Sequence, residues 1–442
     1  MLLSAAARVV RDTLRAYATW SRIEVGTSVA HRRRRVHRRS TGSGRRVVLI
    51  AATFPPVVTG GTYRPLALAR YGTRLGWEIS VVGRDPRSIS AVGRYLLRQV
   101  PAEVRVVRAP RARALRYARG VPTIDGTLAG AFDLYDRGRR AFDAGQADFV
   151  IASGPPFNQF VAALYLARAL GSRLVLDYRD EWTQCPFDFV VPGRTDSWWE
   201  VRCLRAADLV VFGTHSQLER QLQAFPALEP ERCAVVENGW ESADGSAGPA
   251  PTTAPQAQVT ISFVGTFGAF TPPGRLLATV EAMIRARPDL KDKLRLRFVG
   301  RKDGCVRAQL ERFAHPEMFE SIDEVPRPEA TRIMQSASAL LLFNPPELAR
   351  YLPGKLYAYL AARRPILVFG DGGEAATLVR QLDAGVSLEP DDPHALAGAI
   401  DRLAAGTLLP PNGPTVDAWL AAHTYERTAA RFFALLEALA SP

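Results

Sequence analysis

Lys355 stands at the start of a segment whose pattern predicts an α-helix followed by a strand. Pro353 and Gly354 precede it, apolar residues follow at helical spacing, and a strand-like run covers 366–369. Free N–H groups at the beginning of a helix favour anions, and a lysine in the first turn adds its charge to that field. Gly354 and Lys355 are therefore candidates for binding an anionic ligand.

Glycine and polar residues also follow other strand-like runs. The candidates are Gly60, Gly61, Arg179 and Asp180 in the first half of the chain, and Gly265, Thr266, Arg301, Gly372, Gly373 and Glu374 in the second half. Glycine at a helix start lets backbone N–H groups approach phosphate oxygens. Because strand-to-helix turns also use glycine for geometry alone, no single loop identifies a site. Several such loops in the second half, with Arg301 and Lys355 among them, favour a phosphorylated ligand.

Several other kinds of site are not indicated. The chain has no GxGxxG after a strand and no GxxxxGK[ST], which argues against a dehydrogenase and a P-loop enzyme; GDGGEA at 370–375 meets only a looser form of the first motif. It has no Asp-x-Asp, and its four cysteines form no CxxC pair, so we expect neither a diphosphate-bridging metal nor a structural zinc. The cysteine spacing fits a reducing cytoplasm.

The elements that position these residues alternate between strands and helices. With 442 residues, of which 47% are hydrophobic, the chain is long enough for two domains. Apolar strand-like runs separated by helical segments predict a parallel sheet covered on both faces in each half. We expect an α/β protein with two doubly wound, Rossmann-like domains over 46–241 and 259–412. The stretch 242–258, rich in Ala, Pro, Ser, Gly and Thr, predicts a linker between them.

The positive charge is concentrated in a leader over residues 1–45. Residues 1–46 contain twelve arginines and only two acidic residues, so they hold ten of the thirteen net positive charges of the chain. On a helical wheel of 3–22 the arginines gather on one side and apolar residues on another, and a polybasic run follows at 31–39. The arginines expected to meet an anionic membrane surface are Arg8, Arg11, Arg15, Arg22, Arg32, Arg33, Arg34 and Arg35.

The leader does not have the pattern of a membrane span. Arginines interrupt its apolar run, and no stretch of about 18 apolar residues occurs elsewhere. We therefore expect a peripheral protein on the cytoplasmic face of the cell membrane. A disordered basic leader or a misassigned start codon is the alternative interpretation. Nucleic-acid binding is less favoured, because the rest of the chain has no recognition motif or aromatic stacking platform.

The arrangement resembles a GT-B glycosyltransferase, specifically the large family-4 group of retaining, nucleotide-sugar-dependent enzymes. The matching stretches are LIAATFPPVVTGGTYRPLALARYGTRLGWEISVVG, LDYRDEW, ADLVVFGTHSQLERQL, VVENGW, ISFVGTFG and PGKLYAYLAARRPILVFG. They follow the order of the family over most of 46–403. The resemblance implies that the two domains face a cleft and that a C-terminal helix within 413–442 packs back toward the first domain.

The resemblance also implies the substrates and the roles of the candidate residues. The donor would be a nucleotide-diphosphate sugar held mainly by the second domain, and a glycan or lipid-linked acceptor would bind to the first. No metal or further cofactor is expected. The residues matched to the reacting centre are Gly61, Arg179 and Asp180, and those matched to the donor are Gly60, Gly61, Gly265, Thr266, Arg301, Gly354, Lys355, Gly372, Gly373 and Glu374.

Two departures from the family pattern leave other functions open. Many members have Arg and Lys after the first strand of the second domain, where this chain has Thr266 and Pro273 with only Arg275 nearby. They also have acidic residues where Arg350 and Ala358 stand. The alternatives are a catalytically silent nucleotide-sugar-binding or scaffold protein, and a GT-B-fold sugar-nucleotide epimerase that would turn over the donor without an acceptor.

Overall fold

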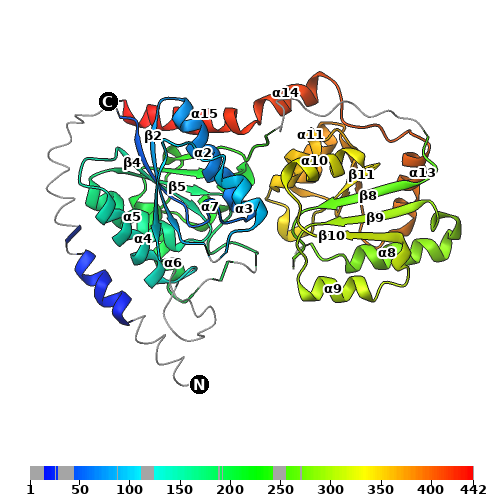
Figure 1. Ribbon diagram of the computed structural model, residues 1–442, viewed down its shortest axis with the longest axis horizontal. Helices are drawn as coiled ribbons and strands as arrows, with labels where there is room; N and C mark the ends of the chain where they lie inside the picture. The colour runs from blue at the N-terminus through cyan, green and yellow to red at the C-terminus, as the bar shows by residue number, and fades with distance from the viewer. Residues whose placement is uncertain are drawn as a thin grey trace. The chain divides into compact units, whose positions relative to one another are not determined.

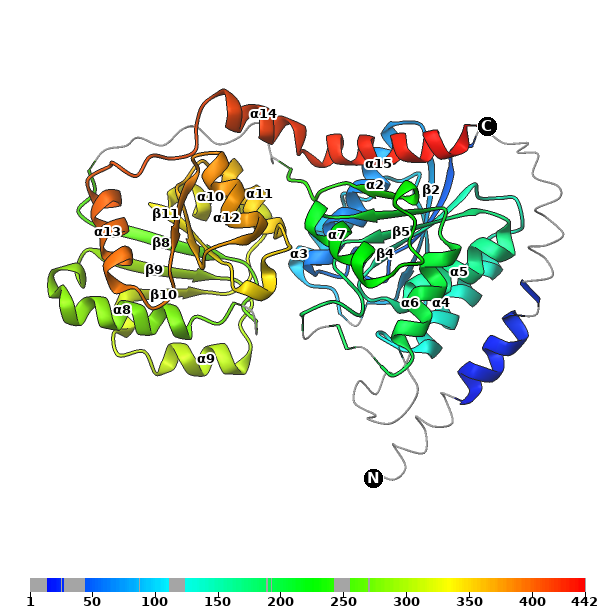
Figure 2. The same ribbon diagram turned by 180° about the vertical axis from the view of Figure 1, so that it is seen from behind.

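The chain folds as two compact α/β units, each built on a parallel sheet (Figures 1 and 2). The computed structural model describes residues 14–24, 26–27, 44–86, 88–110, 124–187, 190–191, 193–241, 255–268 and 271–441. Unit 1 comprises the described residues of Met1–Glu237 and Tyr425–Pro442, and unit 2 those of Asn238–Thr424. Two doubly wound, Rossmann-like domains were expected from the sequence, and this fold class is confirmed.

Unit 1 contains a seven-stranded sheet in the order β3-β2-β1-β4-β5-β6-β7. The strands are β1 (Arg46–Ile50), β2 (Glu78–Arg84), β3 (Arg105–Ala109), β4 (Phe149–Gly154), β5 (Arg173–Tyr178), β6 (Leu209–Phe212) and β7 (Cys233–Val235). The helices are η1 (Gly60–Thr62), α2 (Tyr63–Arg74), α3 (Ala91–Leu97), α4 (Leu128–Ala141), α5 (Asn158–Leu170), α6 (Asp196–Ala206), α7 (His215–Ala224), η2 (Pro230–Arg232) and α15 (Tyr425–Ala440). All the strand pairs are parallel.

The core of unit 1 lies on both faces of this sheet. On one face the strands pack against α5, in which every residue except Arg168 is buried. On the other face they pack against α2 and α15, so Leu66, Phe432 and Phe433 share one apolar cluster. Burial on both faces explains why the central strands are nearly continuous apolar runs.

Unit 2 contains a six-stranded sheet in the order β10-β9-β8-β11-β12-β13. The strands are β8 (Val259–Val264), β9 (Leu294–Val299), β10 (Phe319–Ile322), β11 (Ala339–Phe343), β12 (Ile366–Phe369) and β13 (Gly385–Leu388). The helices are α8 (Gly274–Ala286), η3 (Pro288–Leu290), α9 (Gly304–Glu311), η4 (Pro316–Met318), α10 (Arg327–Ser336), η5 (Pro346–Leu348), α11 (Gly354–Ala361), α12 (Gly373–Gln381), α13 (Pro393–Ala404) and α14 (Pro414–Ala422).

The strand order identifies where each unit can bind a ligand. It reverses between β1 and β4 in unit 1 and between β8 and β11 in unit 2. In open parallel sheets ligands bind beyond the carboxyl ends of the strands, at the reversal. The loops that leave β1 and β5 in unit 1, and β8, β9, β11 and β12 in unit 2, carry the residues predicted from the sequence.

The C-terminal segment 413–442 contains the helix that was expected to pack toward the first domain, α15, and a further helix, α14. It forms two helices, of which α14 belongs to unit 2 and α15 to unit 1, where it packs against α2. The break falls where Thr424 pairs as a β-bridge with Trp240, whose N–H donates to the carbonyl of His423 at 3.0 Å. The linker predicted over 242–258 lies mostly outside the described residues.

Part of the leader is helical and packs on unit 1. The described helix spans residues 14–24. Ala16 is buried, and the Trp20 indole N–H donates to the Tyr165 hydroxyl at 2.6 Å. Arg15 and Arg22 are exposed, whereas Arg8, Arg11, Arg32, Arg33, Arg34 and Arg35 lie outside the described residues. Within the described part of the chain, no helix has both the length and the apolar content needed to span a bilayer.

Candidate functional site

Lys355 occupies the first turn of α11 in unit 2, as the sequence predicts. The helix begins after Pro353, which has an extended backbone at the N-cap. The Lys355 amine lies 4.0 Å from the centroid of the Phe263 ring, and among the described residues it has no hydrogen-bond or ion-pair partner. Burial lowers the pKa of Lys355 to about 7. A cation held against a ring and lacking a carboxylate partner is available for an anionic ligand.

Gly265, at the end of β8, lies directly beside Lys355. A Cβ atom at this position would lie 3.1 Å from the Lys355 amine, and Gly265 has a φ of 154°. The neighbouring loop is equally close, because a Cβ atom on Gly300 would lie 2.1 Å from the Gly265 carbonyl oxygen. Thr266 follows with an exposed side chain. The structure therefore brings Gly265 and Lys355 together and leaves Thr266 at the surface.

Arg301 does not join this group, and its neighbour Lys302 is the buried cation. The Arg301 side chain is exposed. The Lys302 amine instead donates to the carbonyl of Gly300 at 2.9 Å and to the carbonyl of Ile322 at 2.7 Å. These bonds hold the turn after β9 to the end of β10. No sequence pattern indicates which of these two adjacent cations turns inward.

The glycines before α12, Gly372 and Gly373, are required by the backbone conformation and packing at this turn. Gly372 and Gly373 have φ values of 86° and 75°, which favour glycine. A Cβ atom on Gly373 would lie 2.5 Å from the Cα atom of Ala349. The backbone N–H of Glu374 donates to the Ala349 carbonyl at 2.8 Å. These contacts seat α12 against the loop that leads to α11, so geometry alone accounts for both glycines.

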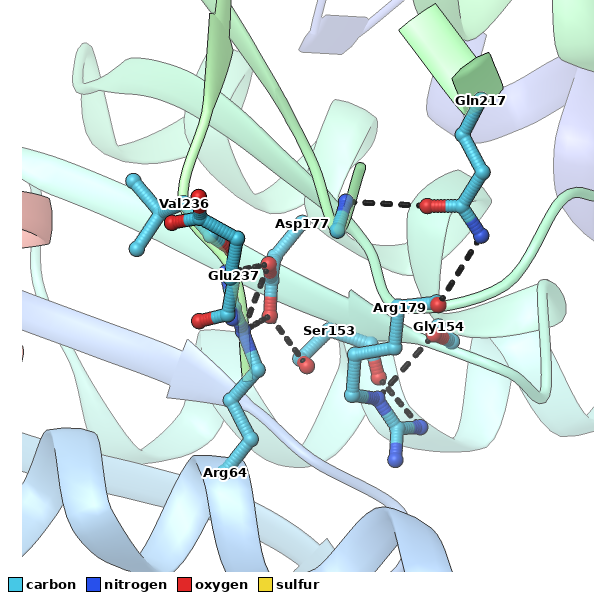
Figure 3. Close-up of polar contacts among 9 residues, drawn as sticks. Arg64, Ser153, Gly154, Asp177, Arg179, Gln217, Val236 and Glu237 are labelled. Atoms are coloured by element: carbon cyan, nitrogen blue, oxygen red, sulfur yellow. Dashed lines mark hydrogen bonds and ion pairs between the residues drawn. The ribbon is translucent and has the colours of Figure 1, made fainter. Parts of the chain in front are cut away.

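In unit 1 the side chain of Arg179 lies against Gly61, and Figure 3 shows its guanidinium beside Gly154. Its Nε donates to the Gly154 carbonyl at 3.1 Å, and its Nη2 donates to the Ser153 carbonyl at 3.2 Å and to that of Pro155. A Cβ atom on Gly61 would lie 1.8 Å from Arg179 Nη1, so only glycine fits here. Two residues 118 positions apart in the sequence are thus in contact at the ends of β1 and β5. Gly60, next to Gly61, is exposed.

Beside Arg179 lies a buried ion pair between Arg64 and Asp177. Arg64, on α2, binds Asp177 of β5 with its Nε 3.0 Å from Oδ1, and its Nη1 donates to the carbonyls of Val236 and Glu237 (Figure 3). The Ser153 hydroxyl donates to Asp177 Oδ2 at 2.6 Å. The two charges are paired within this group, so we assign it to positioning the strand ends.

Asp180 is half-buried, and in the described part of the chain it makes no hydrogen bond or ion pair. It therefore does not pair with the adjacent Arg179 at contact distance. Burial raises the pKa of Asp180 to about 6. An acid with a raised pKa at the end of a central strand is a candidate for contact with substrate.

The structure also shows what the residues that depart from the family pattern contact. Arg275, the nearest cation to the loop after β8, forms an exposed ion pair with Asp391. Ala358 packs at the edge of an apolar cluster with Trp419. No group of three or more His, Cys, Asp or Glu side chains within the described residues is placed to hold a metal ion.

Two family models match the chain. The Glycosyl transferase 4-like domain matches residues 59–239, and the Glycosyl transferases group 1 domain matches residues 258–405. The two matches fall on unit 1 and unit 2 respectively. No curated protein sequence matches the chain significantly.

Solved structures share the fold over nearly their whole length. Sucrose-phosphate synthase from Thermosynechococcus elongatus is 15% identical, with a TM-score of 0.66, and the match covers 89% of this chain and 99% of that one. HepE of Anabaena, in complex with UDP and glucose, is 13% identical with a TM-score of 0.63 and the same coverage. TarM of S. aureus, in complex with Fondaparinux, α-GlcNAc-glycerol and UDP, is 8% identical with a TM-score of 0.61; the match covers 89% of this chain and 99% of that one. The two family matches and this shared architecture identify the chain as a member of the GT-B glycosyltransferases with family-4-like domains.

Proposed function

We propose that the protein transfers a sugar from a nucleoside-diphosphate sugar to a glycan or lipid-linked acceptor, with retention of configuration at the anomeric carbon. The donor binds to unit 2, and the acceptor binds to unit 1. The observation that carries this proposal is Lys355, a cation without an anionic partner among the described residues, at the start of α11 and beside Gly265. HepE and TarM, which have the same fold, were both solved with UDP.

Lys355 stabilises the leaving group in this proposal. Negative charge develops on the nucleoside diphosphate as the bond from the anomeric carbon breaks. A preorganised cation at a helix N-terminus, shielded from water, opposes that charge more strongly than a solvated one. A retaining transfer without a protein nucleophile requires positioning and charge stabilisation, so no pair of carboxylates is needed. Arg179, Asp180 and Gly61 would contact the substrate from unit 1.

We also propose that the transfer needs no divalent metal. The chain has no Asp-x-Asp to bridge a metal to the diphosphate, and Lys355 offers charge in its place. Turnover should be unchanged by EDTA and not increased by Mg²⁺ or Mn²⁺. A rate that falls to background with EDTA and returns with Mn²⁺ would contradict this part of the proposal.

The acceptor is proposed to be at the cytoplasmic face of the cell membrane. The basic leader supports this location, because each basic residue near an anionic surface contributes on the order of 1 kcal/mol of attraction. In co-sedimentation, the protein should bind phosphatidylglycerol-containing vesicles at low salt and not vesicles of neutral lipid. Equal binding to both would argue for a different location.

The central test is a thermal-shift panel of nucleoside diphosphates and nucleotide sugars, with Lys355→Met as the variant. Methionine keeps an apolar side chain against Phe263 and removes the charge. A ligand that binds only the folded state raises the melting temperature according to its concentration relative to Kd. We expect a shift with one base in the wild type and a much smaller shift in the variant. The nucleotide that binds is then taken into assays of sugar transfer.

A second candidate function is that of a catalytically silent nucleotide-sugar-binding protein. It is favoured by Ala358 and by Arg275, whose charge is already engaged by Asp391. This candidate predicts nucleotide binding without hydrolysis or transfer of the donor. A sugar-nucleotide epimerase would instead convert the donor with no acceptor present. Anomeric analysis of donor and product by NMR distinguishes all three.

A further inference from the structure

Arg179 is a buried cation whose protein hydrogen bonds go only to neutral groups. Its side chain is about nine-tenths buried, at 9% exposure. The three acceptors that it binds are the backbone carbonyls of Ser153, Gly154 and Pro155. Carbonyls orient a guanidinium but do not neutralise it, and a buried charge without a counter-ion is costly.

The acids nearest to Arg179 do not supply that counter-ion at contact distance. Asp177 is bound by Arg64 and by the Ser153 hydroxyl. Asp180 attracts Arg179 through space, but no ion pair joins them. Neither acid therefore forms a contact ion pair with the Arg179 guanidinium, so the guanidinium can still accept a negatively charged partner.

One guanidinium nitrogen of Arg179, Nη1, is available for such a partner. Nε and Nη2 are used by the carbonyls, whereas Nη1 has no hydrogen-bond partner among the described residues (Figure 3). Nη1 lies where the side chain of residue 61 would begin, so Gly61 keeps the space beside it open. The three carbonyls fix the plane of the group, which therefore needs little reorganisation to bind a ligand.

We propose that Arg179, with the loop at Gly61, binds one anionic group of the substrate, a phosphate or a carboxylate. A neutral glycan would leave this charge without a counter-ion, whereas an oxyanion would accept a charge-assisted hydrogen bond from Nη1. This inference rests on the proposed function, since it selects among its substrates those that carry an acidic group. The anion can belong to the acceptor, such as a sugar phosphate or a uronic acid, or to a uronic acid in the donor.

The test compares charged and neutral sugars on the full chain by isothermal titration, at constant ionic strength. The probes are methyl glucuronide, inorganic phosphate and methyl glucoside. We expect the wild type to bind at least one of the two anions at least tenfold more tightly than methyl glucoside. Arg179→Gln should remove this preference, and Arg179→Lys should weaken it by loss of the fixed guanidinium plane. Gly61→Ala is a second variant, because its methyl group would displace Nη1 without removing the charge.

The donor site is the matched control. Lys355→Met should lose UDP binding but keep the preference for anions. Arg179→Gln should keep UDP binding but lose the preference for anions. No preference in the wild type, or the same preference in Arg179→Gln, would overturn the inference even if UDP binds. Loss of UDP binding in all proteins would instead count against the proposed function. If the protein binds UDP-glucuronate more tightly than UDP-glucose, and this difference depends on Arg179, the anion belongs to the donor. If it binds the two nucleotide sugars equally but prefers the anions among the free probes, the anion belongs to the acceptor.

Discussion

At the scale of single residues, Lys355 connects nucleotide binding to pH. Burial lowers the pKa of its amine to about 7, so the free protein holds fewer protons on this group than the unfolded chain between pH 7 and the ordinary lysine pKa. The free energy of unfolding should therefore rise with pH across that interval. Nucleotide affinity should do the opposite, because the diphosphate needs the charged amine.

We predict that the affinity for the nucleoside diphosphate falls by up to about tenfold per pH unit above pH 7. Binding at pH 8 should take up close to one proton, as measured by titration calorimetry in buffers of different ionisation enthalpy. Lys355→Arg, which stays charged, should lose both the pH dependence and the proton uptake. Proton uptake that is unchanged in this variant would assign it to another group.

Glu200 supplies a second pH dependence, of the opposite sign, in unit 1. Its carboxyl accepts from the Thr183 N–H at 3.0 Å and from the Tyr178 hydroxyl at 3.2 Å, and burial raises its pKa to about 7. The folded protein therefore favours the neutral acid, so this contribution is complete below pH 4.5 and is lost as the pH rises to 7. Glu200→Gln should be more stable than the wild type at pH 8, on the order of 2 kcal/mol, and similar at pH 4.5. Urea unfolding at both pH values measures the difference.

The sequence predicts candidate site residues by position, but not which side chains turn inward. Spacing places Lys355 in the first turn of a helix, where the structure also has it. The choice between Arg301 and Lys302 depends on the backbone path after Gly300, whose φ of 122° turns Lys302 into the protein. The contact of Gly61 with Arg179 depends on strand order, which no local pattern contains.

At the scale of elements, the sequence predicts the central strands and the two edges of unit 1, which are VRVVRAP for β3 and RCAVVENG for β7, but not the edges of unit 2. β1, β4, β5, β11 and β12 are buried on both faces and therefore read as continuous apolar runs. β10 and β13 form the two edges of the sheet in unit 2 and are largely half-buried or exposed. Their short sequences, FESI and GVSL, have too little apolar content to predict strands.

Two helix glycines allow the same substitution to be compared in opposite settings. A Cβ atom on Gly72 of α2 would lie 2.5 Å from the Phe433 ring of α15, whereas a Cβ atom on Gly398 of α13 has nothing within 4 Å. Gly72→Ala should lower the free energy of unfolding by about 1–3 kcal/mol, because α15 must move away. Gly398→Ala should raise it by about 0.5–1 kcal/mol through helix propensity. Equal effects in urea unfolding would show that α15 does not depend on this close approach.

At the scale of the whole molecule, the leader has two faces with separate roles. The described helix over 14–24 packs on the rest of unit 1 through Trp20 and through Glu24, which accepts from the Tyr165 hydroxyl at 2.5 Å and pairs with Arg168 at 3.3 Å. Its apolar side is thus partly used inside the protein. Arg15 and Arg22 are exposed and free to face an anionic surface.

Separate substitutions should therefore divide stability from membrane binding. Trp20→Ala removes packing and a hydrogen bond, and should lower the free energy of unfolding by about 2 kcal/mol while leaving vesicle binding at low salt nearly unchanged. Arg15→Gln with Arg22→Gln should leave urea unfolding nearly unchanged and weaken binding to anionic vesicles roughly thirtyfold, since each of the two charges near the surface contributes on the order of 1 kcal/mol. If Trp20→Ala alone abolished vesicle binding, the tryptophan would have to leave unit 1 and enter the bilayer, and the docked helix would then be the membrane-free state of the leader.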